Sequence, residues 1–143
     1  MTNIKVNSNT MANSGSLVRI LLIEDNVDNQ LLFRAYLKKL PCQVEIAENG
    51  ALGVEKFTSG NFDLVIMDMQ MPVMDGHTAT RLIRKWEKDQ GREPTPIVVL
   101  TANTLSEMAQ VSLAAGCTVH MTKPIQKAKF IEIIAQYAGS REL

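Results

Sequence analysis

The run LVIMD at residues 64–68, followed by MQMPVMDG at residues 69–76, decides how this sequence folds. Four apolar residues in a row predict a strand that is buried on both faces, and the proline and glycine behind them predict a loop. Asp68 therefore stands at the carboxyl end of a buried strand. An ionised side chain is costly there unless it is paired or coordinated. Open α/β sheets bind their ligands at this end of the strands.

The same strand-then-helix pattern occurs five times along the chain. Strands are predicted at Val18–Glu24, Gln43–Ala47, Leu64–Asp68, Ile97–Thr101 and Val119–Thr122. The second is mixed in character, which suits an edge strand. Five βα units in series predict an α/β fold with a five-stranded parallel sheet, doubly wound, with helices on both faces.

Helical periodicity predicts which residues of the intervening segments face the core. The predicted inward residues are Leu32, Phe33, Tyr36, Leu37 and Leu40 before Pro41; Leu52, Val54 and Phe57 between Asn49-Gly50 and Gly60; Ala79, Leu82, Ile83 and Trp86 after Asp75; and Phe130, Ile131, Ile133 and Ile134 between Gln126 and Tyr137. A capping box at residues 104–107 begins a further predicted helix that stops at Gly116.

Composition limits the classes of protein that this chain can be. Its 143 residues suit one domain at 18–143, preceded by a flexible leader at 1–17 that is rich in Asn, Ser and Thr. Basic and acidic residues balance at 15 each and form no basic stripe, so neither nucleic acid nor a membrane is an expected partner. No apolar run is long enough to span a membrane, and no signal peptide is evident. Cys42 and Cys117 fit reduced thiols in a cytoplasmic protein.

Acidic side chains gather at the predicted strand ends. Glu24 and Asp25 follow the first strand, as Asp68 ends the third. Mg²⁺ takes oxygen ligands, so three clustered carboxylates predict a magnesium site. The alternative for Glu24 and Asp25 is that they only cap the first helix. Asp68 is also a competent nucleophile toward phosphorus, which would give an aspartyl phosphate.

A hydroxyl and a lysine complete this set of strand-end residues. Thr101 ends the fourth strand, where its hydroxyl can donate to a phosphoryl oxygen. Lys123-Pro124 follows the fifth strand, and an X-Pro bond can adopt the cis form. The lysine would supply positive charge to a phosphoryl group.

Together these motifs resemble the receiver domain of bacterial two-component response regulators, and especially the receivers of hybrid sensor kinases and single-domain receivers. The motifs are residues 24–26, 68–76, 100–103 and 123–124, and the resemblance covers about residues 18–137. It implies the flavodoxin-like fold, a phosphoacceptor role for Asp68, and magnesium held by Glu24, Asp25, Asp68 and the carbonyl of Gln70. Thr101 and Lys123 would contact the phosphoryl group.

The resemblance also implies a switch and a set of partners. His120 occupies the switch position, which is usually Tyr or Phe in the family, so this smaller, polar ring departs from the pattern. The alternative is that His120 is a strand residue on a solvated face. Gln70 and Asn103 would tune the lifetime of the phosphoryl group. The donor would be a sensor histidine kinase or a histidine phosphotransfer protein. It would dock on the first helix near Leu31 and Arg34, and the fourth helix with the fifth strand and helix would report the signal. A phosphorylation-dependent dimer is also compatible with the resemblance.

Three other classes of protein fit less well. Haloacid-dehalogenase-like phosphatases also use a strand-end aspartate with magnesium, but they need an acid two residues later, where this chain has Gln70. A receiver-like module that never takes phosphate would lack a site residue, and none is missing. A flavin binder would need a phosphate loop after the first strand, where Glu24 and Asp25 would repel the phosphate.

Overall fold

The computed structural model of this chain describes residues 17–102 and 113–138. Strands and helices alternate in the order β1 Val18–Ile23, α1 Val27–Leu37, β2 Cys42–Ala47, α2 Gly50–Ser59, β3 Leu64–Asp68, α3 Gly76–Asp89, β4 Ile97–Thr101, β5 Val119–Thr122 and α5 Lys127–Tyr137. Residues 113–115, before β5, are also helical. The predictions for the leader over residues 1–16, for the capping box at residues 104–107 and for Asn103 lie outside the described residues.

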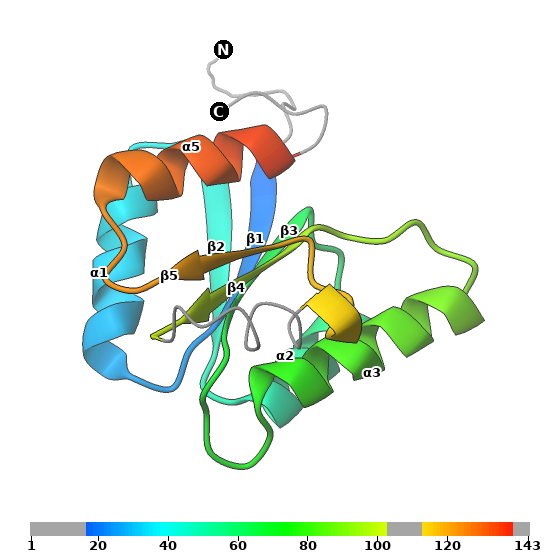
Figure 1. Cartoon of the computed structure of the whole chain (residues 1–143). Helices are drawn as coiled ribbons and strands as arrows, with labels where there is room; N and C mark the ends of the chain where they lie inside the picture. Colours follow the sequence, from blue (N-terminus) through cyan, green and yellow to red (C-terminus); the bar gives the residue numbers. More distant parts are fainter. Residues whose placement is uncertain (1–16, 103–112, 139–143) are drawn as a thin grey trace.

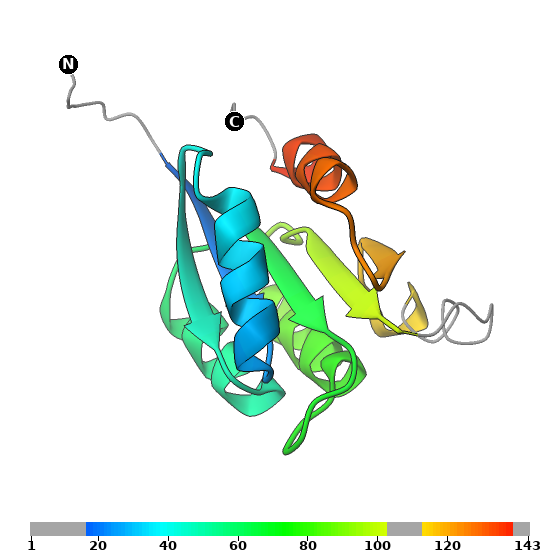
Figure 2. The ribbon, with the colours of Figure 1, turned by 90° about the vertical axis from the view of Figure 1, so that its left-hand side faces the viewer.

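The five strands form one parallel sheet in the order β2-β1-β3-β4-β5. The predicted α/β fold is confirmed, and β2 is an edge strand as expected. The register pairs Asp68 with Leu100 and Thr101 with Thr122. Figure 2 shows that the strand arrows point toward one end of the molecule, where the loop after β3 projects. The residues that end the strands therefore meet at one edge of the sheet.

Two helical layers cover the two faces of the sheet (Figure 1). On β1, Ile20 and Leu22 belong to the core beneath α1 and α5, while Leu21 and Ile23 belong to the core beneath α2 and α3. This alternation follows from the two-residue period of a strand. Burying each such side chain contributes about 1.5–3 kcal/mol. The two apolar layers therefore hold the strand ends in a fixed arrangement.

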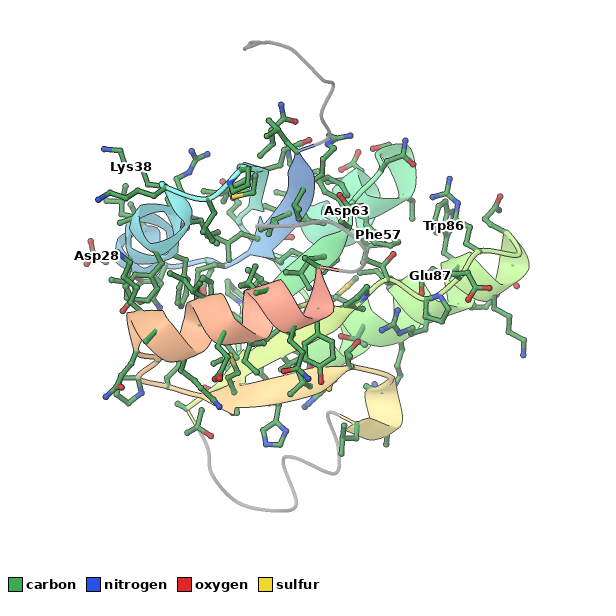
Figure 3. All side chains as sticks on the ribbon, turned by 90° about the horizontal axis from the view of Figure 1, so that it is seen from above. Asp28, Lys38, Phe57, Asp63, Trp86 and Glu87 are labelled. Carbon is green, nitrogen blue, oxygen red and sulfur yellow. The ribbon has the colours of Figure 1, made fainter. Side chains whose placement is uncertain are left out.

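Aromatic contacts support each layer. The rings of Phe33 and Phe130 stack at 5.1 Å between α1 and α5. On the opposite layer, Phe57 of α2 meets Trp86 of α3 edge to face at 5.8 Å. Figure 3 shows Phe57 and Trp86 together on the side of the molecule away from α1. Such pairs add about 0.5–1.5 kcal/mol beyond the area that they bury.

Side-chain caps fix where three helices begin. The side chains of Asn26, Asn49 and Asp75 each accept a hydrogen bond from the backbone N–H three residues later, at 2.8–2.9 Å. This capping satisfies one free N–H group of each helix. The N-cap of α1 is thus Asn26, whose own N–H donates to Oε2 of Glu24 at 3.1 Å.

Several details differ from the sequence predictions. β1 ends at Ile23 rather than Glu24, β2 begins at Cys42 rather than Gln43, and α1 ends at Leu37, before Leu40 and Pro41. Leu32, Leu52 and Leu82, predicted to face the core, are 42%, 38% and 39% exposed. On α2 the predicted Phe57 is buried, and Gly50 and Gly53 are buried in addition. These glycines bring α2 close to its neighbours: a Cβ on Gly53 would lie 2.4 Å from Ile23.

Candidate functional site

Asp68 and Lys123 form the centre of the site. Asp68 ends β3, whose five residues are all buried, and is itself only 5% exposed. The ammonium of Lys123 donates to its Oδ1 at 3.1 Å. The cost of burying the carboxylate is therefore offset by a charged partner, as the sequence required. The predicted proximity of these two strand-end residues is observed.

The backbone around Lys123 sets the direction of this lysine. Its N–H donates to the carbonyl of Thr101 at 2.7 Å, which ties it to the end of β4. The Lys123-Pro124 peptide bond is cis, the form that the sequence allowed. The ammonium also lies 3.8 Å from Oε1 of Glu24. The ammonium of Lys123 thus forms ion pairs with two carboxylates.

Glu24 is fully buried just beyond β1. Its backbone N–H donates to Ala47, and its carbonyl accepts from the side chain of Gln30 at 2.7 Å. Its Oε2 accepts from the N–H of Asn26 at 3.1 Å, whereas its Oε1 is buried without a hydrogen bond. Burial, and secondarily the charge of Asp68, raises the pKa of Glu24 from 4.5 to about 7. This carboxylate lacks a full set of partners in the protein alone.

The predicted metal-binding acids form one cluster. One carboxylate oxygen from each of Glu24, Asp25 and Asp68 lies within 4.8 Å of the others. Asp25 is exposed, whereas the other two are buried, so the cluster opens to solvent at Asp25. Oxygen ligands in this arrangement, with one oxygen of Glu24 unsatisfied, fit a hard divalent cation. The carbonyl of Gln70 stays a predicted ligand.

The two predicted switch residues lie on β4 and β5. Thr101 is buried at the end of β4, in register with Thr122 and bonded through its carbonyl to Lys123. His120 lies two positions before Thr122 on β5, pairs with Val99 and is half-buried. Their coupling stays a prediction, as does the tuning role of Gln70.

Two glycines, Gly76 and Gly50, allow close backbone contacts at the loop after β3. A Cβ on Gly76 would lie 2.5 Å from the carbonyl oxygen of Asp68, and one on Gly50 would lie 2.4 Å from that of Met74. The N–H of Thr78 lowers the pKa of the capping Asp75. Within the loop between β3 and α3, Val73 has a φ of 72° and is 82% exposed. The glycines permit backbone approaches that hydrophobic periodicity does not reveal.

The first helix presents the predicted docking residues to solvent. Leu31 is 61% exposed and Arg34 is exposed three positions later. Val27, four positions before Leu31, is also exposed. Residues at these spacings share one face of a helix. Val27 and Val73, which the sequence pattern did not single out, add exposed apolar surface at the end of the molecule where the strands end.

A concave region lies at the end of the sheet opposite the carboxylate cluster. Its volume is about 560 Å³, and it includes Leu17 and Arg19 at the start of β1, Asp63 before β3 and Thr95 before β4. These positions precede the strands, whereas the carboxylate cluster follows them. This concave region is therefore separate from the predicted phosphoryl and metal site.

Comparison with known proteins identifies the family of this chain. Residues 20–135 match the family model described as the response regulator receiver domain. Hybrid signal transduction histidine kinase M of Dictyostelium discoideum is 37% identical over 125 residues, which is 86% of this chain and 5% of that protein. The sensor histidine kinase GacS of Pseudomonas protegens is 35% identical over 121 residues, or 85% of this chain and 13% of that protein. The chain thus spans a small part of the length of these relatives.

Solved structures agree with this family. The receiver domain of sensor histidine kinase PA1611 from Pseudomonas aeruginosa, with magnesium in its active site cleft, is 34% identical with a TM-score of 0.78, covering 87% of this chain and all of that one (100%). The receiver domain of Ssk1, in complex with the histidine phosphotransfer protein Ypd1 of Saccharomyces cerevisiae, is 31% identical with a TM-score of 0.81, covering 85% and 89%. No helix in the described ranges has the length and apolar character needed to cross a membrane.

Proposed function

This chain belongs to the response regulator receiver domain family of two-component signalling, and from that premise we propose that Asp68 accepts a phosphoryl group from a phosphohistidine on a partner protein. The observation that carries the proposal is the 3.1 Å contact between Lys123 and Asp68 beside the unsatisfied Oε1 of Glu24. A buried carboxylate with a cation at one oxygen and two further acids nearby is arranged to receive a charged group. The domain then acts in signalling rather than as an enzyme for a separate substrate.

The transfer follows from the charges of the site. An oxygen of Asp68 attacks phosphorus in line while the bond from phosphorus to the imidazole nitrogen breaks. The electron pair of that bond returns to the imidazole, which takes a proton from water. Phosphoryl transfer has a loose transition state, so positioning and charge neutralisation contribute most of the catalysis. Lys123, which is already held beside Asp68, neutralises an oxygen of the incoming group.

A cation held by the acidic cluster would neutralise the remaining phosphoryl oxygens. Glu24, Asp25 and Asp68, with the carbonyl of Gln70, would hold Mg²⁺, which supplies positive charge to the phosphoryl oxygens. The support for this is the cluster geometry and the magnesium ion in the similar PA1611 receiver. The hydroxyl of Thr101 would donate a hydrogen bond to the phosphoryl group, and the ring of His120 would change its orientation in response. Hydrolysis of the acyl phosphate would return Asp68 to its starting state.

The donor would be a sensor histidine kinase or a histidine phosphotransfer protein. The similarity to a receiver that is bound to such a protein supports this choice. Leu31, with Arg34 on the same helix, offers an exposed apolar contact and a positive charge at the edge of the site. A partner helix on this face would bring its phosphohistidine toward Asp68.

The proposal is tested by phosphotransfer from a histidine phosphotransfer protein that carries a radioactive phosphoryl group. Wild type is expected to gain the label in the presence of Mg²⁺ and to lose this ability with EDTA. Asp68→Asn should gain none, whereas Asp89→Asn, an exposed aspartate on α3, should behave as wild type. Transfer to Asp68→Asn at the rate of wild type would contradict the proposal.

A further inference from the structure

A side-chain hydrogen bond joins α1 to the segment that carries Lys123. The hydroxyl of Tyr36 donates to the carbonyl of Ile125 at 3.0 Å, across 89 positions of sequence. Ile125 lies two residues after Lys123, whose own N–H is bonded to Thr101. The short segment from Lys123 to Ile125 is therefore held at one end by β4 and at the other end by Tyr36.

Aromatic neighbours fix the ring of Tyr36. The ring lies 6.1 Å from Phe33 on the same helix and 5.5 Å from Phe130 on α5, centroid to centroid. Phe33 and Phe130 are almost fully buried. A tyrosine whose ring is packed in this way has little freedom, so the position of its hydroxyl is set by the core.

Packing also holds one end of the lysine segment, since Ile125 is 7% exposed and belongs to the same core cluster as Phe33 and Phe130. A concave region of about 370 Å³ lies between α1 and the segment, and its lining includes Leu32, Tyr36, Lys123 and Pro124. Leu32, which could have filled this space, is 42% exposed. The Tyr36 hydrogen bond therefore restrains the segment beside this space, in addition to the packing of Ile125.

We propose that Tyr36 is a positioning residue for Lys123: through the carbonyl of Ile125 it holds the segment at the place from which the ammonium reaches Asp68. This inference rests on the proposed function, because it concerns the lysine that neutralises the phosphoryl group. The helix that exposes Leu31 on its outer face thus sets the geometry of the site through Tyr36.

The test measures beryllofluoride binding, as a stand-in for the phosphoryl group, at saturating Mg²⁺. Tyr36→Phe removes only the hydroxyl, and Tyr137→Phe, at a half-buried tyrosine of α5, is the matched control. We expect Tyr36→Phe to bind beryllofluoride about three- to tenfold more weakly, the effect of one neutral hydrogen bond. Its affinity for Mg²⁺ alone should stay within about twofold of wild type, since Lys123 is not a metal ligand.

A double-mutant cycle separates positioning from a general structural role. In a Lys123→Ala background, Tyr36→Phe should have no further effect on beryllofluoride affinity. Equal affinity of Tyr36→Phe and wild type, a matching loss in Tyr137→Phe, or a full additive loss in the Lys123→Ala background would each overturn the inference. If wild type itself binds no beryllofluoride, the proposed function fails instead.

Discussion

The ammonium of Lys123 lies 3.1 Å from Oδ1 of Asp68, although the two residues are 55 positions apart in sequence. β4 lies between β3 and β5 in the sheet, so this ion pair bridges the end of β4, where Thr101 is buried. Three neighbouring strand ends therefore contribute to one site. The same ammonium lies 3.8 Å from Oε1 of Glu24, the acid that directly follows β1.

Replacing Lys123 should separate metal binding from phosphoryl binding. Lys123→Ala is expected to bind Mg²⁺ at least as well as wild type, because a positive charge leaves the carboxylate cluster. Its affinity for beryllofluoride should fall by about ten- to a hundredfold, the effect of losing a charged hydrogen bond. Calorimetric titration measures both affinities, and Lys129→Ala, at an exposed lysine of α5, is the control. Unchanged beryllofluoride affinity would remove Lys123 from the site.

Glu24 should make the stability of the metal-free protein depend on pH. Its pKa is about 7 in the folded protein, whereas an unperturbed glutamate has a pKa of 4.5, so the folded state keeps a proton that the unfolded chain loses. Its contribution to the free energy of unfolding is thus highest below pH 4.5 and falls as pH rises to 7, by about 3 kcal/mol in total.

Urea unfolding in EDTA at pH 5 and pH 8 measures this effect. Glu24→Gln is expected to lose much less stability over that interval than wild type does, whereas Glu55→Gln on the exposed side of α2 should follow wild type. Added Mg²⁺ should stabilise wild type more at pH 8 than at pH 5. An identical pH dependence in wild type and Glu24→Gln would show that Glu24 does not titrate in this range.

Gly50 should be needed for the loop that follows β3. Alanine normally stabilises a helix over glycine by about 0.5–1 kcal/mol. Here its Cβ would lie 2.4 Å from the carbonyl oxygen of Met74, a backbone atom that cannot move without the loop. We expect Gly50→Ala to lower the free energy of unfolding by about 1–3 kcal/mol. Gly60→Ala, where the nearest atom is a Phe62 side chain at 3.1 Å, is the milder control, and a Gly50→Ala protein as stable as wild type would contradict the packing.

Leu31 should matter for a protein donor and not for a small one. Leu31→Asp is expected to slow transfer from a phosphorylated histidine phosphotransfer protein by about tenfold or more, as loss of a central apolar contact does. Labelling by acetyl phosphate should be unaffected, because Leu31 does not touch the carboxylate cluster. Leu82→Asp, at a partly exposed leucine of α3, is the control. Equal transfer rates in wild type and Leu31→Asp would place docking on another surface.

The sequence was sufficient to predict the fold and the meeting of the site residues. Apolar runs such as residues 64–67 and 97–100, which alternate with helical segments, predict central strands, and parallel strands bring their carboxyl ends to one edge. Glu24, Asp25 and Asp68 therefore had to approach one another, together with Lys123. The cluster follows from topology, before any side-chain geometry is known.

Two kinds of detail could not be predicted in this way. Periodicity counts apolar side chains, so it placed Leu52 inward and passed over Gly53, whose lack of a side chain lets α2 approach Ile23. It also cannot show a bond such as that between Tyr36 and Ile125, because a half-buried tyrosine fits the apolar face of a helix with or without a partner. Both depend on distances between elements that are far apart in sequence.

The central claim is that Asp68 is the residue that takes the phosphoryl group with the help of a divalent cation. Its most direct test is the intact mass of the protein after incubation with acetyl phosphate and Mg²⁺. Wild type should gain the mass of one phosphoryl group, and should gain none in EDTA. Asp68→Asn should stay unmodified under both conditions, and undiminished modification of that variant would contradict the account.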